Sequence, residues 1–244
     1  MLALRRFQRL ALAFDPASRR IQGALRRFAA RVAASDRVLD LGSGAAPYAG
    51  IFPHRRYITA DLFAPAAVKC DAAALPFAAG SFDLVLCTEV LEHVPDPDGM
   101  LREIGRILGS RGALALTTPL TWGVHAAQDF CRWTDAGLAR LLGRNGFEIV
   151  ALEARGGIFA CLAALLLVVP WQLLGEAKER RAWQTVLYAG LYLLLVPVAL
   201  LLAALDPLDR RRQFTHGYAA LCRPDRRALV PRVSVAAPHV AERQ

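Results

Sequence analysis

The feature that most constrains this fold is the segment Val38–Ala45, which reads Val-Leu-Asp-Leu-Gly-Ser-Gly-Ala. An apolar run that ends in two closely spaced glycines is typical of a buried strand followed by a turn where the backbone approaches a ligand. Asp61 comes twenty-one residues after Asp40, and an acid at the end of the next strand can accept hydrogen bonds from a ribose diol. The segment therefore predicts an α/β fold with its ligand at the first turn.

The glycine pattern also excludes one use of such a turn. Pro47 stands where the third glycine of G-x-G-x-x-G would be, which argues against a pyrophosphate packed on the start of a helix. The alternative reading of the segment is a plain strand, turn and helix, with an unrelated acid downstream.

Strand and helix patterns alternate along the chain. Strands are expected at Arg37–Leu41, Tyr57–Ala60, Val68–Cys70, Phe82–Cys87, Ala113–Thr117 and Phe147–Glu153. Helices are expected at Asp98–Leu108 and Asp135–Arg144, the second with Thr134 as its N-cap. This order implies a mainly parallel sheet covered on both faces, with the ligand beyond the carboxyl ends of the strands.

The motifs at those strand ends form an ordered series: Val38–Ala45, Tyr57–Asp61, Cys70–Phe77, Ser81–Cys87 and Glu89–Val94. Together they resemble the class I S-adenosylmethionine-dependent methyltransferases, and most closely the small-molecule branch that includes quinone-biosynthesis enzymes. The resemblance covers residues 36–153. It implies a Rossmann-like, doubly wound sheet of seven strands with the last strand antiparallel, and S-adenosyl-L-methionine as the cofactor. The cofactor-binding residues that it implies are Asp40, Gly42, Gly44, Asp61, Asp71, Ala72 and Thr88.

The resemblance also implies individual roles. Asp61 would hold the ribose hydroxyls, and Asp71 would accept a hydrogen bond from the adenine amino group between walls formed by Leu75 and Phe77. Asp83 would be structural. The chain departs from many relatives at Ala45–Tyr48, which puts contacts between a helix start and the cofactor carboxylate in doubt.

Methyl transfer from a sulfonium needs little beyond alignment, but a hydroxyl acceptor profits from a general base. The candidate bases are Glu89, His93, His125 and Asp129. We favour His125 and Asp129 as catalytic residues, because residues 122–134 follow the fifth strand, where relatives build the acceptor pocket. The alternatives are that Asp129 and Arg132 pair to fix this loop, and that Glu92 and His93 brace the turn after the fourth strand. No metal site is expected.

Two apolar runs without charged residues, Ile158–Leu174 and Val186–Leu205, account for most of the mean hydropathy of +0.31. The second is long enough to span a bilayer. Its leucines and valines favour lipid by about 4–7 kcal/mol. Both runs precede a final strand expected at Thr215–Arg223, so they form an inserted hydrophobic helical hairpin. The alternative is a pair of helices buried against a partner or against each other in a dimer.

The predicted organisation has five parts: a basic amphipathic N-terminal region 1–35, a methyltransferase core 36–156, the hairpin 157–209, a final strand 210–224 and a tail 225–244. The N-terminal region either lies on lipid headgroups or covers one edge of the sheet. A secretory signal fits poorly, because Arg9 interrupts its apolar stretch. The five cysteines contain no C-x-x-C pair and read as reduced thiols of a cytosolic domain.

The hairpin is expected to leave and rejoin the sheet at the cofactor edge. We therefore predict a methyltransferase at the cytoplasmic face of a membrane, with its catalytic domain in the cytosol, acting on an oxygen or carbon of a lipidic or lipid-linked acceptor. The alternative function is a catalytically inactive, membrane-tethered binding or assembly subunit. The net charge of +9 invites a nucleic acid, but the arginines cluster beside apolar residues at the N-terminus and no Asn-Pro-Pro-Tyr tetrapeptide follows the fourth strand. No nucleic-acid partner is expected, and the oligomeric state stays open.

Overall fold

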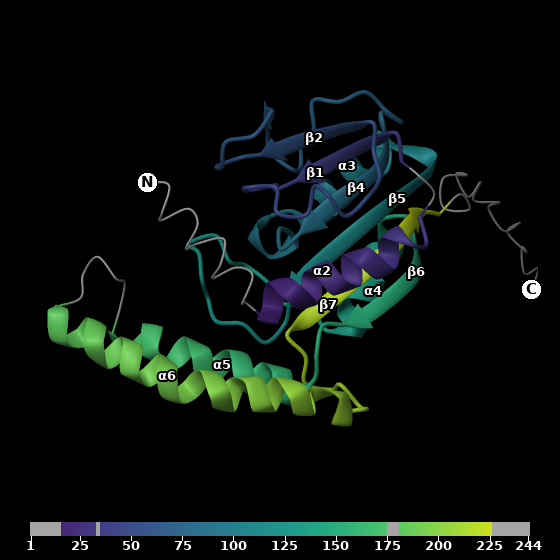
Figure 1. The fold of residues 1–244 in the computed structure, drawn as a ribbon. Coiled ribbons are helices and arrows are strands. Elements are labelled where there is room, and N and C mark those ends of the chain that lie inside the picture. Colours follow the sequence, from purple (N-terminus) through teal and green to yellow (C-terminus); the bar gives the residue numbers. More distant parts are fainter. Residues whose placement is uncertain (1–15, 33–34, 175–180, 226–244) are drawn as a thin grey trace, which may run out of the picture.

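The computed structural model describes residues 16–32, 35–174 and 181–225, and its centre is a seven-stranded sheet in the order β3-β2-β1-β4-β5-β7-β6 (Figure 1). The strands are β1 (Arg37–Leu41), β2 (Arg56–Asp61), β3 (Val68–Lys69), β4 (Phe82–Thr88), β5 (Leu108–Pro119), β6 (Phe147–Ala154) and β7 (Gly217–Pro224). The first five strands pair in parallel, whereas β7 is antiparallel to both β5 and β6. The predicted doubly wound sheet with an antiparallel last strand is confirmed.

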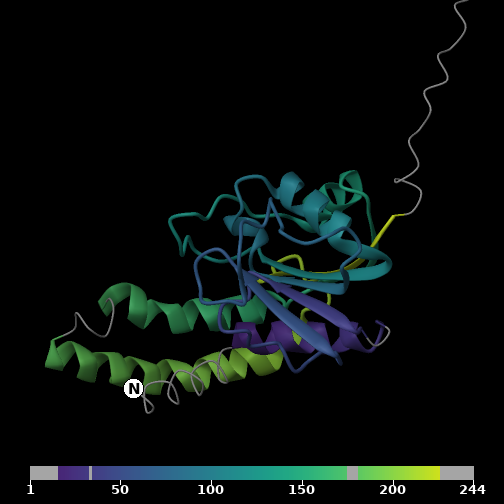
Figure 2. The same ribbon diagram turned by 90° about the horizontal axis from the view of Figure 1, so that it is seen from above.

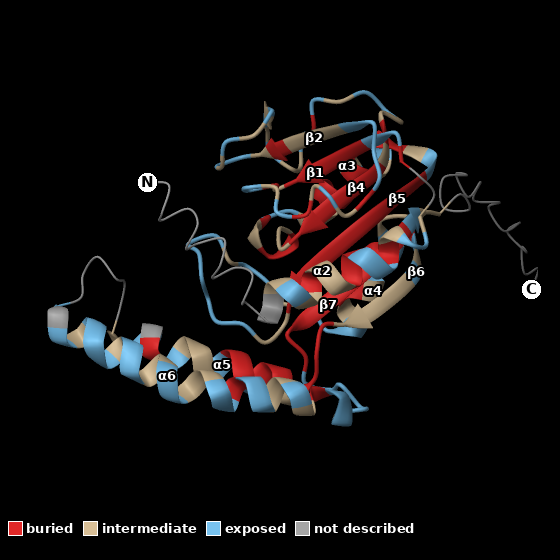
Figure 3. Cartoon of the chain, viewed as in Figure 1, coloured by how far each residue is buried: buried red, intermediate tan, exposed pale blue. Residues whose placement is uncertain are grey.

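Helices cover both faces of the sheet. Helix α2 (Pro16–Ala29) lies on one face, and α3 (Pro97–Ile107) and α4 (Asp135–Arg144) lie on the other (Figure 2). Successive residues of a strand point to opposite faces, so on β1 Val38 packs on the α2 side and Leu39 on the α3 side. Burial on both faces makes the middle strands almost continuously apolar, as Figure 3 shows for β4 and β5.

The helix ends follow the expected capping chemistry. The Asp96 side chain accepts a hydrogen bond from the Gly99 backbone N–H at 2.8 Å at the start of α3. The Thr134 hydroxyl accepts one from Gly137 at 3.1 Å at the start of α4, which has the predicted bounds. In contrast, residues 43–52 after the glycine turn form turns, and no helix, which corrects the strand-turn-helix reading of this segment.

The N-terminal region was expected either to lie on lipid headgroups or to cover the sheet, and the structure answers this for residues 16–29. Helix α2 buries Ile21, Leu25 and Phe28 against the sheet, so residues 16–29 cover the sheet. Arg27 on this helix forms an ion pair with Glu153 of β6 at 2.7 Å. Residues 1–15, with the remaining basic and apolar residues of the predicted region, lie outside the described residues.

The two apolar runs form helices α5 (Ile158–Leu174) and α6 (Ala182–Leu205), which pack along each other and project from the sheet as an arm (Figures 1 and 2). Helix α6 begins four residues before the predicted apolar run, at Ala182 instead of Val186. Among the described residues, the helical stretch Trp183–Leu208, of mean hydropathy 2.4, is long and apolar enough to cross a membrane. Figure 3 shows that burial is concentrated where α5 leaves the sheet, whereas much of α6 is exposed.

The base of the hairpin is tied to the sheet by a buried acid. Asp206, in the 3-10 turn η3 (Asp206–Leu208) after α6, accepts hydrogen bonds from the backbone N–H groups of Gly157 (2.9 Å) and Ala160 (2.8 Å) at the start of α5. Its second oxygen forms an ion pair with Arg20 of α2 at 2.9 Å. One carboxylate therefore joins α2 and both ends of the hairpin.

Candidate active site

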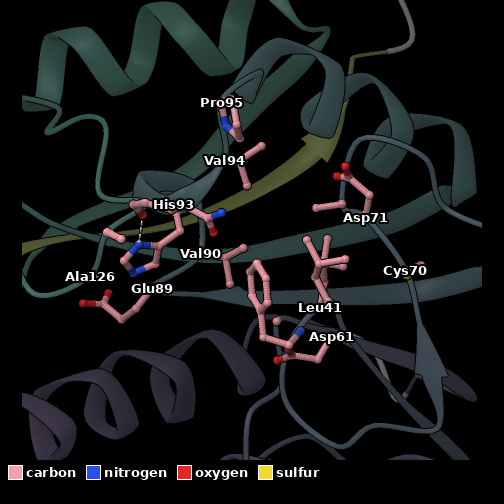
Figure 4. A pocket seen from close by; sticks show the side chains of 16 residues that line it. Leu41, Asp61, Cys70, Asp71, Glu89, Val90, His93, Val94, Pro95 and Ala126 are labelled. Carbon is pink, nitrogen blue, oxygen red and sulfur yellow. Dashed lines mark hydrogen bonds between the residues drawn. The ribbon is translucent and has the colours of Figure 1, made fainter.

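A cavity of about 560 Å³ lies beyond the carboxyl ends of β1, β2 and β4 (Figure 4). Its wall includes four of the seven predicted cofactor-binding residues: Gly42, Asp61, Asp71 and Ala72. Glu89 and His93 lie at one end of the cavity and Asp71 lies at the other. Parallel strands bring these residues together, because their carboxyl ends meet at one edge of the sheet.

The glycine turn has positive φ angles, which residues with a Cβ rarely adopt. Gly42 and Gly44 have φ angles of +66° and +50°. A Cβ on Gly42 would lie 2.3 Å from Val90 Cγ2, so a side chain there would clash with the wall of the cavity. A Cβ on Gly44 would meet nothing within 4 Å among the described residues, so the backbone of this turn faces open space.

Asp61 is fixed by the turn that it faces. One carboxylate oxygen accepts a hydrogen bond from Gly44 N–H at 3.0 Å, and the other accepts from Phe63 at 2.8 Å and Ala64 at 2.7 Å. Burial alone would raise the pKa of Asp61, but these backbone N–H groups lower it below its usual range. Asp61 is therefore an oriented carboxylate at neutral pH.

Asp40 and Thr88 were predicted to bind the cofactor, but they lie buried behind the cavity wall. The Tyr57 hydroxyl donates to Asp40 at 2.6 Å, while burial raises the Asp40 pKa to about 6. Asp40 Oδ1 and the hydroxyl of Ser43 are buried and have no hydrogen-bond partner within the described part of the chain. The floor of the glycine turn thus retains unused acceptors and a donor.

The residues predicted to surround the adenine lie partly at the cavity and partly in the core. Asp71 lies in the cavity wall, and its side chain accepts a hydrogen bond from Ala73 N–H at 2.9 Å. Leu75 and Phe77 were predicted to flank the adenine ring, but they pack into the core instead. Leu75 is buried, and the ring of Phe77 lies edge-to-face against that of Phe82, with 4.9 Å between the ring centroids. Asp83 is structural as expected, since it binds the Arg37 guanidinium at 2.9 Å.

The turn after β4 combines strain and buried charge. Glu89 has a φ of +54°, a left-handed conformation that costs a residue with a Cβ about 1–2 kcal/mol. Its carboxylate accepts from Thr117 at 2.8 Å and pairs with the buried Arg155 at 2.9 Å. Glu92 is fully buried, and this burial, with the negative charge of Glu89, raises its pKa to about 8.

The structure brings His125 against His93, with 3.2 Å between their Nε2 atoms. The loop after β5 folds back onto the turn after β4, where the Phe130 N–H donates to the Glu92 carbonyl at 2.8 Å. His125 is thereby held at the end of the cofactor cavity that His93 lines.

Asp129 takes the positioning role that was its alternative. Its carboxylate binds both terminal nitrogens of Arg132 and accepts from the His125 backbone N–H at 3.2 Å. The Arg132 hydrogen bonds, acting against burial, hold the pKa of Asp129 well below its usual range. A carboxylate so weakly basic orients the loop and His125, and is a poor proton acceptor.

A second cavity, the α5 groove, lies on the far side of His125 and measures about 530 Å³. It runs between the loop after β5 and helix α5, and its wall is formed by Trp122, Gly123, Val124, His125, Leu165, Val168, Val169, Gln172 and Leu173. His125 thus stands between the first cavity, which contains Asp61, Asp71 and Glu89, and an apolar groove.

Residues 126–128, in the cavity wall, belong to the loop 122–134 that was predicted to build the acceptor pocket, whereas Phe63 and Val90 were missed as wall residues. No local pattern marks Phe63, because it follows the second strand in an irregular loop. The pairing of His93 with His125 was missed because it depends on a long-range fold of the chain.

Comparisons with known proteins agree with this geometry. The family described as "Methyltransferase domain" matches residues 13–152, more than half of the chain. An uncharacterized methyltransferase from Mycobacterium sp. (strain KMS) is 29% identical over 182 residues, which cover 63% of this chain and 70% of that protein. The ubiquinone biosynthesis O-methyltransferase of Xanthomonas oryzae pv. oryzae is 54% identical over 39 residues. That match spans 16% of either chain.

Solved structures share the fold at low sequence identity. A structure described as a putative sarcosine dimethylglycine methyltransferase from Galdieria sulphuraria superposes with a TM-score of 0.56 at 17% identity, covering 85% of this chain and 86% of that one. The 1,6-didemethyltoxoflavin-N1-methyltransferase of Burkholderia thailandensis, solved with S-adenosylhomocysteine, gives a TM-score of 0.52 at 17% identity, with coverages of 90% and 83%.

Proposed function

Since this chain belongs to the methyltransferase domain family, we propose that it transfers a methyl group from S-adenosyl-L-methionine to an oxygen or carbon of a lipidic or lipid-linked acceptor in a membrane. When bound, the cofactor supplies a methyl group on a positively charged sulfur. The protein then has to align donor and acceptor, exclude water and manage one proton. The observation that carries the acceptor class is the apolar groove that continues from the site onto the hairpin.

The residues of the first cavity fit this cofactor. Gly44 leaves open space where a side chain would stand, and the turn beneath it keeps unpaired polar atoms on Asp40 and Ser43, within the described residues. Asp61, anionic and fixed, would accept from the ribose hydroxyls, and Asp71 from the adenine amino group. The methionine portion would lie along the glycine turn, toward Glu89 and His93.

The α5 groove supports an acceptor with a long apolar part. A reacting head at His125 would leave an aliphatic tail along Leu165, Val169 and Leu173 of α5, where burial of each methylene contributes about 0.8 kcal/mol. A polar metabolite would gain nothing from such a wall. His125 would accept the proton of an acceptor hydroxyl, with Asp129 orienting its ring.

The surface of the hairpin supports a membrane setting. Leu193 and Leu194 on α6 are 81% and 67% exposed, and a soluble protein rarely exposes large apolar side chains in such an array. We place the catalytic domain at the cytoplasmic face of that membrane, because its cysteines are free thiols, as expected in a reducing compartment.

Calorimetric titration of the detergent-solubilised full chain with S-adenosylmethionine tests the cofactor. We expect micromolar binding, at least tenfold weaker in Asp61→Asn and unchanged in Asp36→Asn, which alters an exposed acid beside β1 that pairs with Arg55. A folded wild-type protein that fails to bind would refute the enzyme and favour the inactive, membrane-tethered subunit.

Flotation with phosphatidylethanolamine and phosphatidylglycerol vesicles tests the membrane. Replacing Leu193 and Leu194 by arginine adds about 6–8 kcal/mol to the free energy of insertion at the centre of a helix, so the variant should stay with the soluble fraction. Val150→Arg, at an exposed apolar residue of β6, is the control and should float with the vesicles. Methyl-tritiated cofactor should then label an organic-soluble lipid with the wild type. Label in water-soluble products alone would refute a lipidic acceptor.

A further inference from the structure

We propose that Glu92, His93 and His125 bind a divalent transition-metal ion, best matched by Zn²⁺, at the acceptor end of the cofactor cavity. One potential ligand atom from each residue lies within 4.8 Å of the other two. The role of this ion in methyl transfer rests on the proposed function, whereas its binding can be measured without any activity.

The hydrogen bonds of the two rings favour the neutral tautomer in which Nε2 offers a lone pair. His93 Nδ1 lies 2.5 Å from the Gln128 carbonyl oxygen, and His125 Nδ1 lies 3.0 Å from an Asp129 carboxylate oxygen and 3.2 Å from the Gly123 carbonyl. All three partners are acceptors, so each Nδ1 must carry the ring proton. The two Nε2 lone pairs then face each other across 3.2 Å, which is repulsive unless a cation lies between them.

The distances fit a metal ion. Tetrahedral zinc with Zn–N bonds of about 2.0–2.1 Å places two imidazole nitrogens about 3.3 Å apart. A third ligand is at hand, because Glu92 Oε1 lies 3.7 Å from His93 Nε2, is fully buried and has no hydrogen-bond partner in the described part of the chain. Two histidines and one carboxylate with a free fourth position are typical of catalytic zinc sites.

The surroundings resemble those of metal sites as well. Histidines that bind metals almost always donate the other ring N–H to a backbone carbonyl or a carboxylate, as His93 does to the Gln128 carbonyl and His125 does to the Gly123 carbonyl. The positive charges of two arginines, Arg132 and Arg155, stabilise a negative charge on Glu92. Each already pairs with another acid, Asp129 and Glu89 respectively, so Glu92 remains available to a cation.

The free position would face the acceptor. His93 lines the cofactor cavity and His125 lines the α5 groove, so the ion would lie where the two meet. A cation there lowers the pKa of an acceptor hydroxyl. Because the ion then occupies Nε2 of His125, it takes over the role proposed above for that histidine, and the proton passes to solvent. The oxygen lone pair then forms the new O–C bond to the methyl group, and the electron pair of the broken C–S bond returns to sulfur. The proposal thus favours an oxygen as the methylated atom.

The test is titration of untagged, chelator-treated full-length protein in detergent with Co²⁺, read by visible absorption, and with Zn²⁺, read by calorimetry. We expect one site, weakened at least tenfold in His125→Gln, His93→Gln and Glu92→Gln. His54→Gln and Cys131→Ser are controls, because His54 binds the Phe52 carbonyl far from the site and Cys131 is an exposed thiol. Both controls should bind as the wild type does.

Equal binding by the three ligand variants, or absence of binding by folded wild type, would overturn the metal site. In the latter case the histidines share a proton in place of the ion. His125 is partly exposed, so its variant should fold even if the change at the buried Glu92 does not. Cofactor binding in the same samples keeps the two proposals apart. Metal bound without cofactor would refute the proposed function alone, and cofactor bound without metal would refute this site alone.

Discussion

Replacing Asp206 by alanine should destabilise the protein far more than its position in a three-residue turn suggests. Asp206 is 3% exposed, caps the start of α5 through Gly157 and Ala160, and pairs with Arg20. Removing one partner of a buried ion pair costs about 3–5 kcal/mol, because the other charge stays behind without compensation. The lost N-cap, worth about 1 kcal/mol, is part of that sum and is not additional.

For a chain of this size, each kcal/mol lowers the Tm by about 2–4 °C, so the variant should melt about 6–20 °C below the wild type. Thermal unfolding followed by circular dichroism in one detergent measures this. Asp209→Ala is the matched control. Asp209 also accepts an N–H of α5, from Ile158 at 2.8 Å, but its partly exposed side chain forms no buried ion pair in the described part of the chain, so the Tm of this variant should fall less. Equal shifts for the two alanine variants would refute the reasoning.

Two further outcomes are expected. Gly42→Ala should abolish calorimetric binding of S-adenosylmethionine, because its Cβ would lie 2.3 Å from Val90 Cγ2, and Val90→Ala should restore binding in part; full binding by the single variant would contradict this geometry. Asp40→Asn should flatten the pH dependence of stability. Burial raises the Asp40 pKa from 3.8 to about 6, so its stabilising contribution is complete below about pH 3.8 and is lost as the pH rises through about 6. Denaturant titrations of both proteins from pH 4 to 7.5 measure the difference, and parallel curves would contradict it.

The sheet could be predicted from patterns of residues that are close together in the chain. The apolar strands, the glycine turn and the acids at strand ends depend on residues adjacent in the chain, and Gly42, Asp61 and Asp71 duly meet in one cavity. The hairpin helices were equally predictable, because long runs of leucine and valine without charge have few alternatives to a helix.

The remaining features depend on contacts between distant parts of the chain. His125 reaches His93 because the loop after β5 folds back onto the turn after β4, and no periodicity in residues 122–134 encodes that path. Leu75 was expected at the ligand, yet an apolar side chain is stabilised equally by a core, and Leu75 packs in the core. Asp206 caps α5 by accepting a hydrogen bond from Ala160, which is 46 residues away in the sequence, and no local motif predicts this contact.

The place of β7 in the sheet constrains the order in which the protein can be built. β7 follows the hairpin in the chain, yet it fills the gap between β5 and the edge strand β6. During synthesis, β6 therefore cannot pair with β7 until both apolar helices have left the ribosome. If those helices insert into a bilayer, they do so before the catalytic domain is complete, and the domain closes already anchored. Membrane delivery would then precede completion of the sheet, because β7 is the last strand to be made.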